Sequence, residues 1–314
     1  MGIHHLRNYL FQPQVEIVGV VDRDANLLRQ VKEKYGIPGF SDAEQVMALV
    51  DAVSIATPTS THFTIAQQFL RHGKHVLIEK PITSEAHEAR ELIALARHNR
   101  AVLAVGHIER FNPVMQELET IISGRKPLFI DIHRESPYDA RIFDTDVVAD
   151  LTIHDIDLLR YLLQEPIEVK SAYGVRAHSA SSDIIVAQMA SSSGVLINIT
   201  TSRATEQKVR EWRLIMRDQL IEADLVERKL HITRSTSVAM EAIRGGAAVQ
   251  YKQEQVIEKV LVPSYEPLQM EIADFLDAIR TGKSPKVDGN EGLHALEVVK
   301  HIQALVADKQ IQRS

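Results

Sequence analysis

VEIVGVVD (residues 15–22) is an apolar run, rich in β-branched side chains, that ends on an acidic residue. Such a run is typical of a strand that is covered on both faces of a parallel sheet. Three similar runs follow, with segments of helical spacing between them (strands at 51–57, 74–81 and 101–107; helices at 26–36, 62–73 and 84–99). Alternation of strands and helices with short links predicts right-handed crossovers and a doubly wound parallel sheet.

The chain opens on MGIHHLRNYL, an amphipathic, helix-like stretch that runs directly into this strand. In a dinucleotide-binding Rossmann unit, an acidic residue about 20 residues past the glycine-rich loop binds the adenosine ribose. Asp22 follows Gly2 at this interval, so Met1-Gly2 fits the end of a G-x-G-x-x-G turn, and the following helix would hold the pyrophosphate at its N-terminus. We therefore expect the first strand and the first two glycines to be missing from this sequence. The alternative, an ordinary Gly2 and a turn residue at Asp22, stays open.

The pattern changes after Pro113. From residue 167 to about 235, short alternating strands dominate, as in an antiparallel sheet with one covered face, and a helix around 150–163 precedes them. Two helices close the chain. We predict a Rossmann domain over 1–113 and an α+β open-sheet domain over 114–314. The second domain would hold substrate and subunit contacts, and its C-terminal helices would pack back on the first domain.

The composition is that of a globular protein, with 45% hydrophobic and 25% charged residues in a chain of 314. The formal net charge of −6 argues against a general affinity for nucleic acid or anionic membranes. The sequence has no cysteine, which excludes disulfides, thiolate metal sites and a cysteine nucleophile. No apolar run reaches the roughly 20 residues of a membrane span, and we see no signal segment. We expect a soluble, cytoplasmic enzyme or binding protein without a metal site.

Small and polar residues follow two of the predicted strands. Thr57-Pro58 leaves one strand, with His62 shortly after, and Glu79-Lys80-Pro81 ends the next. The carboxyl ends of parallel strands form the ligand crevice of such a sheet. A partly desolvated lysine there can donate a hydrogen bond to a reacting oxygen and stabilise its alkoxide character. A solvated surface loop is the alternative for the Glu-Lys pair.

A third candidate is DLTIHDIDLLRYLL (150–163), in which Asp150 and His154 are four residues apart and would share one helix face. A carboxylate beside an imidazole fixes its tautomer and raises its basicity, as a general base for a hydroxyl proton requires. Two alternatives stay open: a metal site formed with Asp157, and a helix N-terminal carboxylate beside a satisfied histidine.

Polar residues near the expected domain crossover and at a strand end are lesser candidates for substrate binding: Arg110, Asn112, Arg141 and Arg203. Arginines at these places would suit a diphosphate or carboxylate on the substrate. Interdomain ion pairs or solvated strand edges are equally open interpretations.

Five stretches occur together in the order and spacing of a known family: VVDRD, ATPTSTH, HVLIEKPIT, DLTIHDID and the closing EPLQMEIADFLDAIRTGKSPKVDGNEGLHALEVV. On these residues, nearly the whole chain resembles the glucose–fructose oxidoreductase, inositol dehydrogenase and rhizopine-catabolism (Gfo/Idh/MocA) superfamily of NAD(P)-dependent sugar dehydrogenases. The resemblance implies NAD as cofactor, with NADP as the alternative, and hydride transfer from a secondary alcohol carbon of a sugar. The opening departs from the family, whose glycine-rich fingerprint is reduced here to Met1-Gly2.

The resemblance also implies roles by position. Asp22 would bind the adenosine ribose, and Arg23 would contact a 2′-phosphate if NADP is used. Lys80 would bind the oxygen of the reacting carbinol, and His154, oriented by Asp150, would accept its proton. Around the nicotinamide it implies Thr57, Pro58, His62, Glu79 and Pro81.

GHIERFNP (106–113) with HRESPYDAR (133–141) further resembles the branch that oxidises the 3-hydroxyl of UDP-N-acetylglucosamine-type sugars. Inositol and free-hexose dehydrogenases share the same core residues and remain alternatives. An alternative of another class is a non-catalytic, NAD-sensing regulatory protein, since the fold also occurs in a repressor. The presence of Lys80, Asp150 and His154 favours catalysis, because a sensor needs no proton-transfer set.

Two further expectations concern the whole chain. We expect a homodimer or homotetramer formed through the open face of the second sheet, because uncovered alternating strands would leave apolar area in water. The second is an alternative to both the enzyme and the regulatory protein: an inert, N-terminally short chain. A parallel sheet that lacks a central strand would lose its hydrogen-bond ladders.

Overall fold

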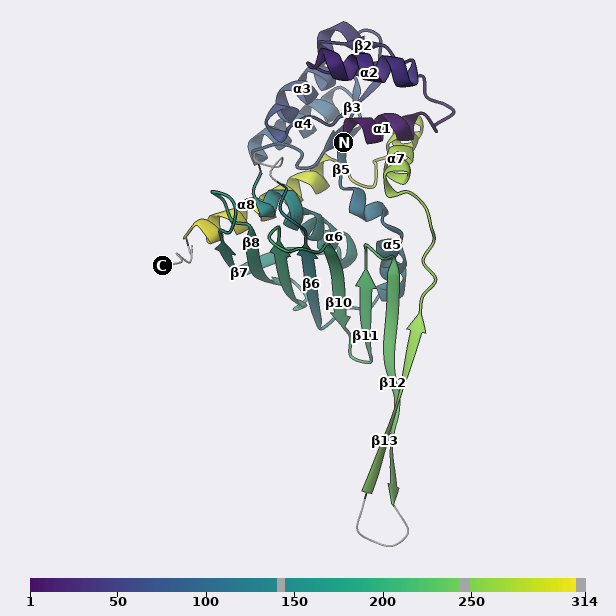
Figure 1. Ribbon diagram of the computed structural model, residues 1–314, viewed down its shortest axis with the longest axis vertical. Coiled ribbons are helices and arrows are strands. Elements are labelled where there is room, and N and C mark those ends of the chain that lie inside the picture. Colours follow the sequence, from purple (N-terminus) through teal and green to yellow (C-terminus); the bar gives the residue numbers. More distant parts are fainter. Residues whose placement is uncertain (140–144, 243–248, 309–314) are drawn as a thin grey trace. The chain divides into compact units, whose positions relative to one another are not determined.

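The structure is a computed structural model that describes residues 1–139, 145–242 and 249–308 (Figure 1). Contacts divide the chain into two compact units. Unit 1 holds Met1–Phe111 and Tyr265–Glu297, and unit 2 holds Asn112–Ser264 and the chain from Val298. The first division lies beside the boundary expected at residue 113, and the segment after Ser264 returns to the N-terminal unit.

Unit 1 alternates helices and strands. Gly36 and Gly282 end two of its helices in the left-handed conformation (φ 71° and 69°), which favours glycine. Its strands are β1 (Val20–Val21), β2 (Gly39–Phe40), β3 (Ala52–Ile55), β4 (His75–Glu79) and β5 (Leu103–Gly106). Its helices are α1 (Gly2–Tyr9), α2 (Ala25–Tyr35), η1 (Ala43–Val46), α3 (Thr59–Arg71), α4 (Ala86–His98), η2 (Ile108–Phe111), α7 (Pro267–Thr281) and the start of α8 (Gly289–Asp308).

The parallel strands of unit 1 form two separate sheets. β1 pairs with β2 alone, whereas β3, β4 and β5 form a second sheet in that order. Helices α3 and α4 pack on one face of the three-stranded sheet, and α1 and α7 pack on the other. This is the doubly wound arrangement that the sequence predicts, and it encloses the buried strands β4 and β5.

The apolar run at 15–22 differs from the expectation of a strand covered on both faces. Only Val20–Val21 form a strand, no residue of the run is buried, and Val21 is 37% exposed. Helix α2, which follows it, has no buried residue either. The run lines a cavity, and this is why its apolar side chains lie outside a packed core.

Unit 2 is built on one eight-stranded sheet with the order β13-β12-β11-β10-β6-β9-β8-β7 (Figure 1). The sequence suggests an antiparallel sheet, but the central pair β6–β9 is parallel. The strands are β6 (Phe129–Glu135), β7 (Ile167–Val175), β8 (Ile184–Ser191), β9 (Leu196–Ser202), β10 (Val209–Ile215), β11 (Gln219–Asp224), β12 (Lys229–Ala242) and β13 (Val249–Lys259). The helices are α5 (Pro113–Ile122), a π-helical turn η3 (Val148–Thr152), α6 (Ile153–Leu163) and the end of α8.

A buried charged network joins α6 to the centre of this sheet. Arg134 of β6 is 1% exposed, and its guanidinium donates two hydrogen bonds to the carboxylate of Asp155, at 2.6 and 2.9 Å. The indole N–H of Trp212 donates to the same carboxylate at 3.1 Å. Because both charges are paired and hydrogen-bonded, the network can exist among the apolar side chains around it.

One row of side chains across the opposite face of the sheet is polar. Asn198 donates to Asp131 at 2.8 Å, and Arg213 lies 3.3 Å from Glu222. These four residues, with Gln188, form one continuous cross-strand row. A neighbouring row on the same face is apolar, with Leu196 and Ile215 exposed on either side of Phe129, so the face is mixed. The homodimer or homotetramer stays a prediction.

Candidate active site

The carboxyl ends of β1 and β3 border a cavity of about 1440 Å³ in unit 1. Three of the predicted cofactor residues line it, namely Gly2, Asp22 and Thr57. Gly2 begins α1, and Met1 makes no side-chain cap there. Exposed backbone N–H groups at a helix N-terminus favour an anion such as a diphosphate. The cavity thus combines a helix N-terminus, a carboxylate and a strand-end threonine, residues that could hold a dinucleotide.

Asp22 is fixed at the edge of this cavity. Its N–H donates to the carbonyl of Phe40 at 3.1 Å, and one carboxylate oxygen accepts from the N–H of Asp24 at 2.8 Å. A carboxylate at the end of this strand suits a ribose diol and repels a 2′-phosphate, which favours NAD. Arg23, the residue considered for NADP, is exposed.

His62 is buried and bridges two strand ends. Its two ring nitrogens lie 2.9 Å from the carbonyl oxygens of Thr57 and Pro81. Burial lowers the pKa of His62 although both carbonyls favour the charged form. A neutral ring donates one hydrogen bond at a time, so His62 alternates between the two contacts or keeps one tautomer. This geometry gives His62 a positioning role, in addition to the predicted place beside the cofactor.

Glu79 ends β4 and pairs with a residue that the sequence does not single out. His5 of α1 lies 2.8 Å from its carboxylate and 3.3 Å from the hydroxyl of Ser54, and both His5 and Glu79 are less than 10% exposed. Burial alone would raise the pKa of Glu79, but the hydrogen bond and charge of His5, together with Lys80, lower it below its usual value. The pair fixes the start of α1 against the end of β4.

Lys80 follows Glu79 directly and is half-buried, and the peptide bond between Lys80 and Pro81 is cis. Pro81 is buried, and its carbonyl oxygen contacts His62. The residues from Glu79 to Pro81 therefore leave the sheet at its carboxyl edge, as the sequence predicts. Pro58 is exposed and is the N-cap residue of α3 at the end of the neighbouring strand.

Unit 2 holds the other two predicted catalytic residues. Asp150 lies in the π-helical turn η3, and His154, 8% exposed, lies in the first turn of α6. The helix expected around 150–163 therefore begins with a π-helical turn, and the pairing of Asp150 with His154 stays a prediction. π-Helical turns are rare in proteins, and those that occur often lie at functional sites. This supports a function for the segment.

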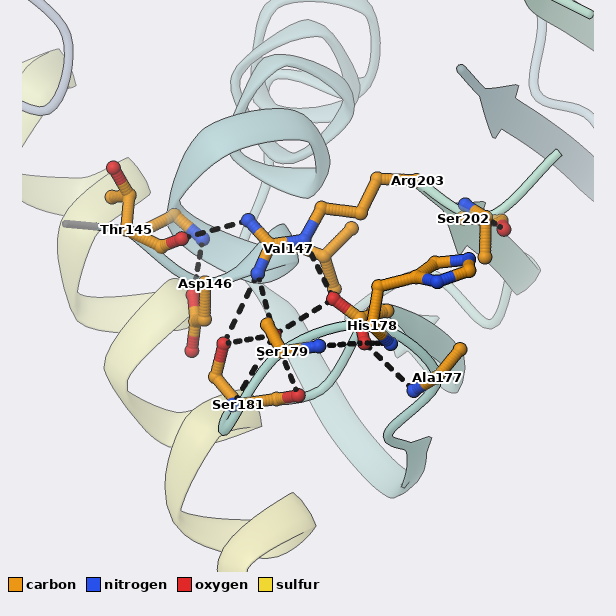
Figure 2. Close-up of polar contacts among 12 residues, drawn as sticks. Thr145, Asp146, Val147, Ala177, His178, Ser179, Ser181, Ser202 and Arg203 are labelled. Atoms are coloured by element: carbon orange, nitrogen blue, oxygen red, sulfur yellow. Dashed lines mark hydrogen bonds and ion pairs between the residues drawn. The ribbon is translucent and has the colours of Figure 1, made fainter. Parts of the chain in front are cut away.

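Arg203, a predicted substrate residue, is engaged within unit 2, as Figure 2 shows. Its guanidinium donates to the carboxylate of Asp183 at 2.9 Å and to the carbonyl of Thr145 at 2.8 Å. It also donates to the hydroxyls of Ser179 and Ser181, at 3.0 and 3.1 Å. Four hydrogen bonds leave one of its five N–H groups for any other partner.

Asp183 organises the loop before β8 around this arginine. Its carboxylate accepts from the backbone N–H groups of Ala177, His178 and Ser179, at 2.7, 2.6 and 3.0 Å. Burial would raise the pKa of Asp183, but these hydrogen bonds outweigh it and hold the pKa well below the usual range. The contacts favour a structural role for Arg203, and its substrate contact stays a prediction.

Two of the remaining predicted substrate residues, Arg110 and Asn112, have structural partners of their own. In unit 1, Arg110 is 3% exposed and donates to Glu291 at 2.6 Å. In unit 2, Asn112 caps α5 by accepting from the N–H of Val114 at 3.1 Å. Arg141 lies outside the described residues.

Metal ligation and membrane insertion find no support in the part of the chain that the structure describes. No group of three or more His, Asp or Glu side chains there could hold a metal ion, including the set of Asp150, His154 and Asp157. Within the same residues, no helix is both long and apolar enough to cross a membrane.

Comparison with protein families gives two successive matches along the chain. Residues 1–107 match the GFO_IDH_MocA model, described as an oxidoreductase family with an NAD-binding Rossmann fold. Residues 130–221 match the model of the GFO/IDH/MocA C-terminal domain.

Individual relatives match along the whole chain. UDP-N-acetylglucosamine 3-dehydrogenase of Acidithiobacillus ferrooxidans is 33% identical, over 98% of this chain and 96% of its own. A solved structure of that enzyme has a TM-score of 0.86, covering 98% of this chain and 94% of that chain. Inositol 2-dehydrogenase of Rhizobium meliloti is 28% identical, over 99% of this chain and 95% of its own.

Proposed function

Because the chain belongs to the GFO/IDH/MocA family of NAD-binding oxidoreductases, we propose that it oxidises the 3-hydroxyl of a UDP-N-acetylhexosamine. The observation that carries this proposal is the 33% identity to a UDP-N-acetylglucosamine 3-dehydrogenase along both units. The second candidate is an inositol dehydrogenase, which the 28% identity to inositol 2-dehydrogenase favours.

The residues of this chain would act on the oxygen and the proton of the substrate. Bound NAD would supply the acceptor for the hydride that leaves the sugar carbon. Lys80, half-buried after β4, donates a hydrogen bond to the reacting oxygen and stabilises its developing negative charge. His154 accepts the hydroxyl proton with Asp150 as its orienting carboxylate. One alcohol thereby becomes one ketone, with one hydride and one proton removed.

The cofactor residues would divide the dinucleotide among them. The N-terminus of α1 at Gly2 would hold the pyrophosphate, and Asp22 would bind the adenosine ribose. Thr57 and Pro58 would lie beside the nicotinamide, with His62 and the Glu79–Pro81 turn positioning that edge. The charge of Asp22 makes NAD the preferred cofactor.

A labelled substrate tests the proposed reaction. We would supply NAD⁺ with UDP-N-acetylglucosamine that carries deuterium at C3, and with myo-inositol in a parallel assay. The expected result is a nucleotide-sugar ketone and deuterium in the reduced cofactor. Faster turnover of myo-inositol, or deuterium retained in the sugar, would reject the proposed substrate.

Substitution of Lys80 separates an enzyme from a cofactor sensor. We expect Lys80→Met to lower kcat by about 10² to 10⁴, the usual contribution of such a group, while NADH affinity changes less than about twofold. Lys283→Met, at an exposed lysine of unit 1, is the matched control and should leave kcat unchanged. A wild-type chain that binds NADH tightly and turns over no sugar would support the sensor instead.

A further inference from the structure

A chain of four polar side chains links α1 and β3 to the end of β4 within unit 1. Tyr9 and Ser54 share a hydrogen bond of 2.8 Å, and the Ser54 hydroxyl lies 3.3 Å from Nδ1 of His5. Nε2 of His5 in turn lies 2.8 Å from the Glu79 carboxylate. Burial raises the pKa of Tyr9, so its phenol keeps the hydrogen that it donates. When Nε2 of His5 carries the ring hydrogen, each member donates to the next, and the chain ends on Glu79.

The carboxylate of Glu79 has a confined place in this arrangement. Glu79 is 8% exposed, and its side chain lies over Gly106 of the neighbouring strand β5. A Cβ atom added at Gly106 would be 3.2 Å from a carboxylate oxygen, so the missing side chain provides the space that the carboxylate occupies. A buried carboxylate requires hydrogen bonds to replace those of water, and His5 donates one of them.

The turn that leaves β4 is held on both sides of Lys80 by a histidine. His5 contacts the Glu79 carboxylate before the lysine, and a ring nitrogen of His62 lies 2.9 Å from the carbonyl oxygen of Pro81 after it. Both histidines are buried. Fixing the backbone on either side of Lys80 limits the positions that its flexible four-carbon side chain can reach.

His5 and Lys80 both act on the same carboxylate. Burial raises the pKa of Glu79, and the hydrogen bond and charge of His5, followed by the charge of Lys80, lower it below its usual value. Without His5, the buried carboxylate would lose a hydrogen bond, and Lys80, the next residue in the chain, carries a cation that could replace it. Such an ion pair would hold the ammonium group away from a reacting oxygen.

We propose that His5 is a positioning residue for the reaction: its hydrogen bond to Glu79 fixes the turn that carries Lys80 and keeps the lysine ammonium available to the substrate oxygen. The role of Lys80 in this statement rests on the proposed function, whereas the fixed turn is a property of the chain without cofactor or substrate. The two parts therefore have separate tests.

Hydrogen exchange tests the fixed turn in the chain without ligands. We would compare wild type with His5→Ala and with His5→Gln, whose amide N–H can donate to Glu79 in place of the ring. The expected result for His5→Ala is at least about tenfold faster exchange in peptides that cover residues 79–83, with β5 unchanged. His5→Gln should restore most of the protection. Equal loss of protection in β5, or no change at the turn, would overturn the proposal.

Steady-state kinetics test the effect on Lys80. We expect His5→Ala to lower kcat by about 10- to 100-fold, as displacement of a catalytic group does, while KM for UDP-N-acetylglucosamine changes less than about twofold. His5→Gln should recover most of kcat, and His98→Ala, at an exposed histidine that ends α4, serves as control and should leave kcat unchanged.

Two kinetic outcomes would overturn the positioning role: a raised KM with unchanged kcat, or a His5→Gln variant as slow as His5→Ala. A wild-type chain that turns over no sugar would reject the proposed function, and with it the part of the proposal that concerns Lys80. The exchange experiment would still decide whether His5 fixes the turn, so the two failures are distinguishable.

Discussion

Single buried polar side chains in this protein hold loops and strand ends in place. Arg203 and Asp183 fix the loop before β8, and His62 connects the carbonyls of Thr57 and Pro81. Such groups stay buried only because each has several hydrogen bonds, and removal of one partner leaves a buried polar group without its hydrogen bond. Their substitution should therefore cost stability before it affects chemistry.

Asp183→Asn should destabilise the protein strongly near neutral pH. The change removes the charge that Arg203 and three backbone N–H groups require, and a broken buried pair typically costs about 3–5 kcal/mol. The measurement is urea unfolding followed by circular dichroism. Asp218→Asn is the control, because Asp218 pairs with Arg125 in an exposed position, and such pairs contribute about 0–1 kcal/mol. Equal effects of the two substitutions would contradict the assigned role.

The difference between wild type and Asp183→Asn should also shrink in acid. The folded pKa of Asp183 is lowered, so its carboxylate contributes fully above the unfolded value of about 3.9 and loses this contribution as pH falls through the folded pKa. Unfolding curves at intervals between pH 5 and pH 2 would show it. A constant difference across this range would mean that the charge of Asp183 is not the cause.

At the scale of elements, helix ends are determined by local sequence. Gly36 and Gly282 mark the ends of α2 and α7, and the sequence alone predicts both helices. Gly174 in β7 has a different reason: a Cβ atom there would lie 2.4 Å from the Ser182 hydroxyl and 2.5 Å from a Val306 methyl group. Such closeness leaves no space for a side chain.

Gly174→Ala should therefore destabilise unit 2 by about 1–3 kcal/mol through overpacking. Chemical denaturation measures the change. Ser171→Ala on the same strand removes an exposed hydroxyl contact with Gln188 and should stay within about 0.5 kcal/mol. If Gly174→Ala were as stable as Ser171→Ala, the contact between β7 and α8 would be looser than the structure indicates.

Most of the fold can be predicted from the sequence, because apolar periodicity and glycine positions are local signals. Strand–helix alternation and the residues at the ends of β3 and β4 are features that such local signals predict. The parallel pairing of β6 with β9 does not, because pairing depends on the rest of the sheet. His154 and Asp155 are adjacent polar residues, and the sequence alone does not separate their roles. Only the structure shows that Asp155 binds Arg134.

For the whole molecule, the two units differ in how complete their sheets are. Unit 1 distributes five strands over two sheets, whereas unit 2 joins eight strands in one. Open edges and half-buried apolar side chains reduce the free energy that stabilises unit 1. The two units should therefore differ in stability along one chain.

We expect two thermal transitions, with unit 1 unfolding first. Differential scanning calorimetry would resolve them, and hydrogen exchange at rising temperature would assign each to its unit. Addition of NADH should raise the first transition, because a ligand stabilises the folded state that binds it. A single transition, or earlier unfolding of β7 to β11, would contradict this order.

The position of β6 in the sheet of unit 2 has a consequence for synthesis of the chain. β7, β8 and β9 are sequential neighbours, as are β10 to β13, and β6 is the one strand that joins these two sets. Yet β6 leaves the ribosome before all of them and must wait for β9 and β10, more than 60 residues later. Pairing between distant segments is slow, and unfinished edges aggregate. The nascent chain is therefore most vulnerable between the emergence of β6 and that of β10, the interval in which a chaperone would have the greatest effect on yield.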